Sequence, residues 1–144
     1  MALGENVVIH AGCVIGDDVK IGVHLHDDTG CGVANALAGV RGGAVQVQGT
    51  INGYGERCGN ANLCAIIPAL ELKMGCRALP EGRLKGLYTS AHFVAEVANM
   101  HPPEYQAYVG SAAFSHKAGV HIDSVLKLKR SYEHVPPESV GNST

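Results

Sequence analysis

The sequence predicts an α/β fold with a pair of parallel strands. Residues 20–26 have the apolar character of a buried strand, and residues 44–50 alternate apolar and polar side chains as a half-buried strand does. Between them, residues 33–40 place their larger apolar side chains on one stripe, which indicates an amphipathic helix. A strand, a helix and a strand within about thirty residues form a unit whose strands run parallel with a right-handed crossover.

The composition is that of a globular chain of about one domain's length. At 144 residues, with 46% hydrophobic and 17% charged residues, the chain can bury a core, and long disorder is excluded. A formal net charge of −2 argues against nucleic acid as the main partner. No stretch is apolar enough to span a membrane and the first residues lack the pattern of a signal peptide, so we expect a cytoplasmic protein. The five cysteines form no C-x-x-C pair, so we expect reduced thiols.

The first twenty residues have a spacing of their own. An aliphatic residue recurs at every sixth position, at Leu3, Ile9, Ile15 and Ile21. This spacing resembles the hexapeptide repeat of left-handed β-helix acyltransferases, in which such residues point inward from each corner of a coil. One coil cannot bury its own face. We therefore expect residues 1–21 to form a short β-rich lead-in, or alternatively a remnant of such an acyltransferase with His10 as a candidate base.

The chain after the second strand begins with a glycine-rich loop at residues 51–60. Asn60 or Asn62 can cap a helix over residues 63–74, and Pro68 inside that helix should bend or divide it.

The remaining segments are predicted to be mainly helical. Residues 76–83 form a linker, residues 84–98 an amphipathic helix, and His101-Pro102-Pro103 the stop of that helix. A further apolar helix is expected around residues 120–128, and residues 132–137 form an irregular loop.

Two histidines near the end of the first strand are candidate metal ligands. His24 and His26 are two residues apart, so a strand presents both imidazoles on the same face. Neutral imidazoles on a rigid strand suit a divalent metal, although an isolated H-x-H pair is a weak signal in a chain with 8 histidines. Asp27 and Asp28, which follow at once, can orient these histidines or cap the next helix.

Four blocks of sequence carry a resemblance to one enzyme family. They are G-V-H-L-H-D-D-T-G-C-G-V-A-N, Q-V-Q-G-T-I-N-G-Y-G-E-R-C-G-N-A-N-L, Y-V-G-S-A-A-F-S-H-K-A-G-V-H and S-Y-E-H-V-P-P-E-S-V-G-N. In this order they resemble the 2-isopropylmalate, citramalate and homocitrate synthases, relatives of hydroxymethylglutaryl-CoA lyase. The wording is most similar to the citramalate synthase branch, and the resemblance runs from about Gly22 to Asn142.

The resemblance implies an acyltransferase of branched-chain amino-acid biosynthesis. Such enzymes condense acetyl-CoA with a 2-oxo acid in a Claisen-type reaction and hydrolyse the thioester, which leaves a 2-hydroxy dicarboxylic acid. Their catalytic domain is a TIM barrel with a divalent metal, here Zn²⁺, Mn²⁺ or Mg²⁺, at the carboxyl ends of the strands. By this resemblance, residues 22–75 correspond to the last two strands and helices of the barrel, and residues 76–144 to a helical subdomain after it.

The family's site residues carry over to six positions. His24 and His26 match its metal-binding H-x-H, and Asn60 matches the asparagine of its G-E-R-x-G-N loop, which completes the metal ligands on this side. Glu56 in the same loop resembles a carboxylate that supports acid/base chemistry, although a salt bridge to Arg57 or a solvated charge is an equal alternative.

The other two positions are His121 and Tyr132, which match residues that the family brings to the active site from the second subunit of a dimer. Read without the resemblance, His121 is an ordinary surface or core histidine and Tyr132 a packing aromatic.

The chain supplies only two of the eight strands that a TIM barrel needs. We therefore expect the isolated chain to be inactive and to associate, either as a homodimer or through exposed barrel edges. The alternative function is a non-catalytic oligomerisation module that uses the helices from residue 84 onward.

Overall fold

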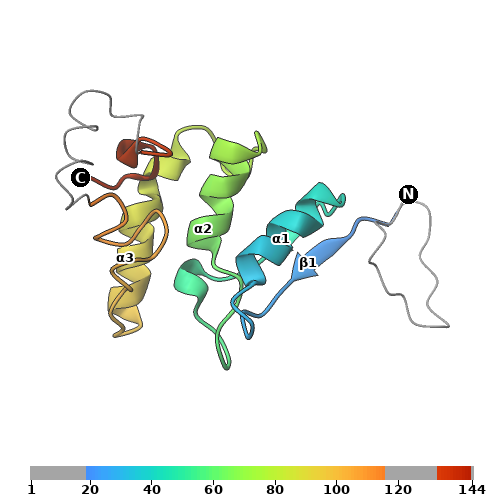
Figure 1. Ribbon diagram of the computed structural model, residues 1–144, viewed down its shortest axis with the longest axis horizontal. Helices are drawn as coiled ribbons and strands as arrows, with labels where there is room; N and C mark the ends of the chain where they lie inside the picture. Colours follow the sequence, from blue (N-terminus) through green and yellow to red (C-terminus); the bar gives the residue numbers. More distant parts are fainter. Residues whose placement is uncertain (1–18, 116–132, 144) are drawn as a thin grey trace.

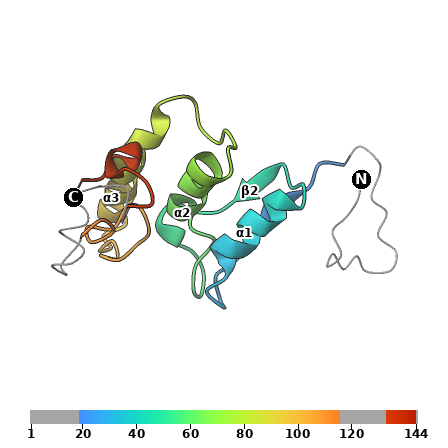
Figure 2. The same cartoon turned by 45° about the horizontal axis from the view of Figure 1, so that its top comes forward.

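The computed structural model describes residues 19–115 and 133–143, and its first half is a strand–helix–strand unit. Strand β1 spans Gly22–His24, helix α1 spans Gly32–Arg41 and strand β2 spans Gln46–Gln48. The strands are parallel, as predicted, and α1 packs beside them (Figures 1 and 2). The α/β fold class is thereby confirmed.

The two strands form the whole sheet within the described ranges and are shorter than expected. Their register pairs Gly22 with Gln46, Val23 with Val47 and His24 with Gln48. Beyond His24 the chain no longer pairs with β2, and His26 instead pairs with Asn60 in an isolated antiparallel bridge. The regular ladder therefore ends at the residues that were predicted to form the site.

Helix α1 lies close to the strands because its inner face is small. A Cβ on Gly39 would come within 3.0 Å of Val23 Cγ1, so this glycine permits the close approach. Ala36 is fully buried in a small core with Ala61, Ile66 and Leu70. These contacts hold the βαβ unit against the next helix.

Helix α2 spans Leu63–Pro68 and continues directly as a π-helical turn over Ala69–Lys73. Pro68 thus divides the predicted helix, since it has no N–H for the regular hydrogen-bond ladder and the register widens after it. Of the two asparagines that could cap this helix, Asn62 does so: its Oδ1 accepts a hydrogen bond of 2.9 Å from the Cys64 N–H.

The predicted helix over residues 84–98 is present as a 3₁₀ turn, Arg83–Gly86, followed by α3, Leu87–Val97. It ends within one residue of the predicted position, with three residues between its end and His101-Pro102-Pro103. Asn99 adopts a φ of 53°, and the Met100 N–H donates to the Ala95 carbonyl at 2.9 Å. A left-handed asparagine therefore closes the helix by satisfying its last carbonyls.

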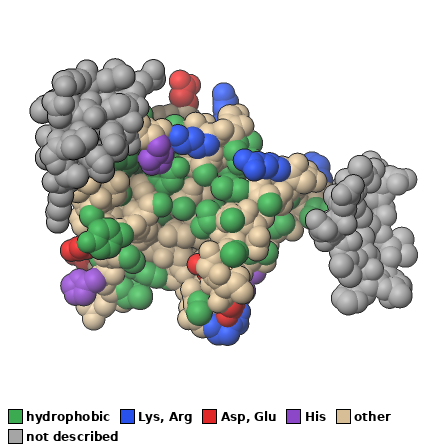
Figure 3. All heavy atoms as spheres, in the orientation of Figure 1, with side chains coloured by type: hydrophobic (Ala, Val, Ile, Leu, Met, Phe, Trp, Pro, Cys, Tyr) green, Lys and Arg blue, Asp and Glu red, His purple; other side chains and the backbone are tan. Residues whose placement is uncertain are grey.

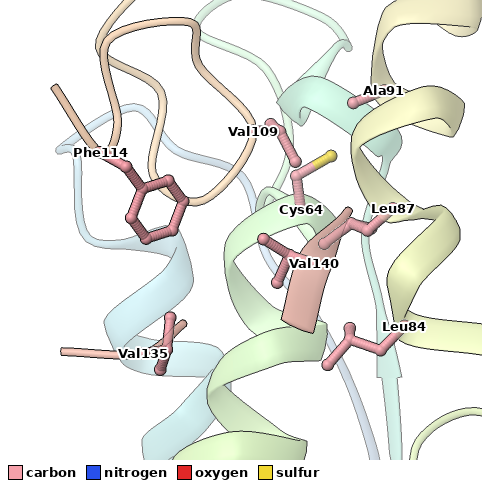
Figure 4. Close-up of a cluster of buried hydrophobic side chains, with 8 residues drawn as sticks. All are labelled: Cys64, Leu84, Leu87, Ala91, Val109, Phe114, Val135 and Val140. Carbon is pink, nitrogen blue, oxygen red and sulfur yellow. The ribbon is translucent and has the colours of Figure 1, made fainter. Parts of the chain in front are cut away.

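A second core joins the later elements of the chain (Figure 4). It unites α2, α3, the loop that precedes residue 115 and the C-terminal 3₁₀ turn Pro137–Val140 through Cys64, Leu84, Leu87, Ala91, Val109, Phe114, Val135 and Val140. Residues 133–136 precede this turn as irregular chain, as predicted. The helix expected around residues 120–128 lies outside the described residues, and none of the described helices is long and apolar enough to cross a membrane.

The surface shows an apolar groove beside β2. It has a volume of about 530 Å³ and is lined mainly by aliphatic side chains in or beside β2 and α2, among them Val45, Val47, Leu63, Ile66 and Leu70. Figure 3 shows apolar side chains over the middle of the face that carries α2, while most of the visible Lys and Arg side chains lie along one edge.

Candidate metal centre

The two histidines of the H-x-H pair lie side by side where β1 ends. Their ring centroids are 5.5 Å apart, with the rings inclined at 69°. His24 is exposed, whereas His26 is half-buried. The alternation of the extended chain therefore brings the imidazoles together as the sequence predicts.

Asn60 is held opposite His26 by the backbone. The two residues form the isolated bridge, which is flanked by hydrogen bonds of 2.9 Å from the Asp27 N–H to the Gly59 carbonyl and from the Ala61 N–H to the Leu25 carbonyl. Asn60 comes from the loop after β2 and His26 from the chain after β1. Their predicted proximity is therefore present in the structure.

Both residues of this bridge carry an unsatisfied buried polar atom. Four buried side-chain atoms have no hydrogen-bond partner in the described part of the chain: His26 Nδ1, Tyr54 Oη, Asn60 Oδ1 and Gln106 Oε1. A buried lone pair without a partner costs free energy, so such atoms call for a ligand. An imidazole nitrogen and an amide oxygen both coordinate divalent metals, so these residues fit the metal that the sequence predicts.

The donor set is an incomplete metal shell. Within residues 19–115 and 133–143, no three His, Cys, Asp or Glu side chains converge closely enough to hold a metal ion. His24, His26 and Asn60 would therefore supply two imidazoles and one amide, and further ligands must come from elsewhere.

The glycines of the loop give Asn60 its position. The Asn60 side-chain amide packs directly on Gly55, because a Cβ on this glycine would lie 2.9–3.0 Å from the amide atoms. Gly59 has a φ of +90°, and a Cβ there would overlap the Gly53 carbonyl oxygen. That oxygen accepts the Asn60 N–H at 3.0 Å, so the turn is too tight for a larger residue.

The acidic residues beside the histidines divide their roles. Asp27 Oδ1 accepts a hydrogen bond of 2.6 Å from the N–H of Gly32, the first residue of α1, so of the two predicted roles this residue caps the helix. The carboxylate of Asp28 pairs with Arg57 through Nε at 2.7 Å and Nη2 at 2.9 Å. Hydrogen bonding to this guanidinium lowers the pKa of Asp28.

Glu56 does not form an ion pair with its sequence neighbour Arg57. Arg57 pairs with Asp28 across the loop, so the alternative in which Arg57 neutralises Glu56 is wrong. The Glu56 side chain is exposed on the loop that carries Asn60, and the predicted acid/base role stays a prediction.

Three other candidates, His10, His121 and Tyr132, lie outside the described residues, and their predicted roles stay predictions. Two residues of the loop were not predicted from the sequence. Tyr54 buries an unpaired hydroxyl, and its place between two glycines of the ligand loop is the signal that could have found it. Asn52 is buried with a φ of 61°, and its N-G dipeptide is the corresponding signal.

Comparison with known families gives two adjacent matches. Residues 6–94 match the HMGL-like family, and residues 108–144 match the domain described as homocitrate synthase post-HMGL domain-like. The first match takes in most of the stretch with hexapeptide-like spacing, and the domain boundaries at residues 21 and 75 stay predictions.

Comparison with individual proteins gives relatives with assigned activities. The chain is 54% identical over 124 residues to an (R)-citramalate synthase of Geobacter sulfurreducens, which covers 86% of this chain and 24% of that protein. It is 54% identical over 125 residues to the (R)-citramalate synthase of Aquifex aeolicus, 87% of this chain and 24% of that protein. A 2-isopropylmalate synthase of Brevibacillus brevis is 45% identical over 126 residues, 87% of this chain and 25% of that protein. The chain thus spans about a quarter of the length of these relatives.

Proposed function

Because the chain belongs to the HMGL-like family, we propose that it is part of a condensing acyltransferase of the citramalate synthase type. Its substrates would be acetyl-CoA and a 2-oxo acid, and its product a 2-hydroxy dicarboxylic acid. The observation that carries this proposal is the pair of unpartnered metal-type donors, His26 Nδ1 and Asn60 Oδ1, brought together by the bridge inside the matched range. The expected compartment of such a synthase is the cytoplasm.

We propose that β1 and β2 are the last two strands of a TIM barrel. Their parallel pairing and the helix between them agree with one βα step of such a barrel. The apolar groove beside β2 and the exposed Val45 would be covered by further barrel elements. In the isolated chain these surfaces would favour association, as a homodimer or through the barrel edges.

The chain's own residues would hold the metal from two loops. His24 and His26 present imidazoles from the end of β1, and Asn60 presents its amide oxygen from the next loop. The Asp28–Arg57 pair ties the tip of one loop to the other. A divalent ion, Zn²⁺, Mn²⁺ or Mg²⁺, would polarise the ketone of the 2-oxo acid and stabilise the alkoxide that forms.

Proton transfer would fall to other residues of the chain. Glu56, exposed on the Asn60 loop, would support acid/base chemistry beside the metal. His121 and Tyr132 would reach the site of a partner subunit, as in the resemblance described above.

The experiment that tests metal binding is a thermal shift of the full chain with Zn²⁺, Mn²⁺ or Mg²⁺. At a metal concentration of about 100 times Kd, the wild-type chain should gain about 2.7 kcal/mol of stability. The double variant His24→Ala/His26→Ala should lose this gain, and Asn60→Ala should reduce it. His101→Ala is the matched control, because His101 is an exposed histidine away from the bridge.

A wild-type chain indifferent to all three metals would contradict the proposed site and favour the non-catalytic oligomerisation module. Catalysis is tested separately, by release of the CoA thiol from acetyl-CoA and pyruvate. We expect none from the isolated chain, because its described part provides two strands where a complete barrel provides eight. Turnover by the purified chain would contradict that expectation.

A further inference from the structure

A buried polar network surrounds Asn52, in the short 3₁₀ turn Ile51–Gly53 that follows β2. Its Nδ2 donates to the carbonyl of Ala91 in α3 at 2.8 Å, and its Oδ1 accepts from Gln106 Nε2 at 3.1 Å. Its backbone N–H donates to Cys64 Sγ at 3.4 Å, and the Cys64 thiol donates back to Oδ1 at 3.5 Å. One side chain therefore joins the turn to α2, to α3 and to the loop after α3.

Because this network is buried, the loss of one of its hydrogen bonds is costly. Asn52 is 9% exposed, Gln106 8%, and Cys64 and Ala91 are fully buried. Figure 4 shows the Cys64 sulfur on the side that faces Ala91 of α3. Removing one partner from such a buried set leaves the others unsatisfied, with little water to replace it.

The network reaches the candidate metal centre through one peptide. Asn52 has a φ of 61° and Gly53 a φ of 72°, so the chain turns sharply here and directs the Gly53 carbonyl toward the later part of the loop. That carbonyl accepts the Asn60 N–H at 3.0 Å. The place of the Asn60 backbone thus depends on the place of Gly53, which Asn52 fastens to α3.

We propose that Asn52 is a positioning residue for Asn60, and that it couples the metal-binding loop to α3 and to the loop containing Gln106. This inference rests on the proposed function, because Asn60 matters as a ligand of the proposed metal. The segment after the predicted barrel would then determine how firmly the amide ligand is held. Asn52 itself touches neither metal nor substrate.

The test is amide hydrogen exchange of the metal-free full chain, read at the Asn60 N–H. The Asn35 N–H in α1, which donates to the Cys31 carbonyl just before the helix, serves as the reference, so that the ratio of the two rates removes changes in global stability. In Asn52→Gly this ratio should rise about 10- to 100-fold, the effect of leaving buried hydrogen-bonding groups unpaired. Glycine tolerates the positive φ, so the substitution adds no backbone strain at this position.

Asn142→Ala is the matched control. Asn142 is 8% exposed, close to the 9% of Asn52, and its Nδ2 also donates to backbone carbonyls, those of Tyr108 at 3.0 Å and Gly110 at 3.1 Å. This variant should lose stability but change the exchange ratio much less than Asn52→Gly, because Asn142 holds the loop that contains Gln106 and makes no bond to Asn52. Gln106→Ala removes one bond to Asn52 and should raise the ratio by a smaller factor, which keeps the test open if Asn52→Gly does not fold.

A second readout is the affinity for Mn²⁺, measured by calorimetry. Asn52→Gly should weaken it about 10-fold, the equivalent of one hydrogen bond's free energy, and Asn142→Ala should weaken it much less. An unchanged exchange ratio in Asn52→Gly, or an unchanged affinity where the wild type binds, would overturn the proposal. If the wild type binds no metal, the proposed function fails, and the exchange ratio still decides whether Asn52 positions Asn60.

Discussion

Replacement of Gly59 by alanine should break the link between the two ligand loops. Gly59 has a φ of +90°, and a Cβ at this position would overlap the Gly53 carbonyl oxygen. That oxygen accepts the Asn60 N–H, and the Gly59 carbonyl accepts the Asp27 N–H. Both neighbours are backbone atoms, so the methyl group has no flexible side chain to displace and must push the two loops apart.

The magnitude follows from the bonds at stake. Each backbone hydrogen bond contributes a net of about 0.5–1.5 kcal/mol, and a left-handed backbone costs a residue with a Cβ about 1–2 kcal/mol. We expect Gly59→Ala to lower the free energy of unfolding by about 2–5 kcal/mol. Gly75→Ala is the matched control, since Gly75 has a φ of +67° and a Cβ there would meet no atom within 4 Å, so this variant should lose only about 1–2 kcal/mol.

The assay is urea denaturation of the metal-free chain, followed by far-ultraviolet circular dichroism. The Gly59→Ala midpoint should fall clearly below that of Gly75→Ala, and a Gly59 variant that is already unfolded beside a folded Gly75 variant gives the same answer. Equal midpoints for the two variants would refute the reasoning, because backbone strain alone would then explain both.

Two further predictions concern titratable groups that are not proposed metal ligands. The pKa of the His134 imidazole is lowered because the ring is partly desolvated against aromatic rings and lies close to the Lys73 ammonium. Below about pH 6.5 the unfolded chain therefore binds more protons than the folded one, and the free energy of unfolding should decrease as the pH is lowered. A His134→Gln variant with the same pH dependence of stability as the wild type would contradict this. Burial raises the pKa of the Cys64 thiol and shields it from reagents. In the native chain a maleimide should therefore label the exposed Cys31 and Cys58 and should label Cys64 only in denaturant, as measured by peptide mass spectrometry. Rapid labelling of Cys64 in the native chain would contradict its burial in the second core.

The local elements were predictable because their signals are local. The apolar stripe of residues 33–40 gave the position of α1, which spans Gly32–Arg41, to within one residue at each end. Pro68 divided its helix as expected from its missing N–H. The end of α3 was predicted to within one residue, but the left-handed Asn99 that closes the helix was not predicted, because prolines are conspicuous in a sequence and such an asparagine is not.

The candidate site was predictable in its residue types and less so in its contacts. The pattern of the extended chain is enough to place His24 beside His26. Asn60 and Asn62 are equally good caps in sequence, and the bridge to His26 separates them by engaging Asn60. Arg57 stands next to Glu56 in the chain but pairs with Asp28, 29 residues away.

By itself, the sequence determined the strand–helix–strand order, the histidine pair and the glycines that the ligand loop requires. Each of these follows from a repeat or a dipeptide within a few neighbouring residues. Only the tertiary structure decided which side chains meet. Asn52 finds its partners 39 and 54 residues further along the chain, and such contacts arise from packing α3 and the loop after it against the turn, which no local pattern encodes.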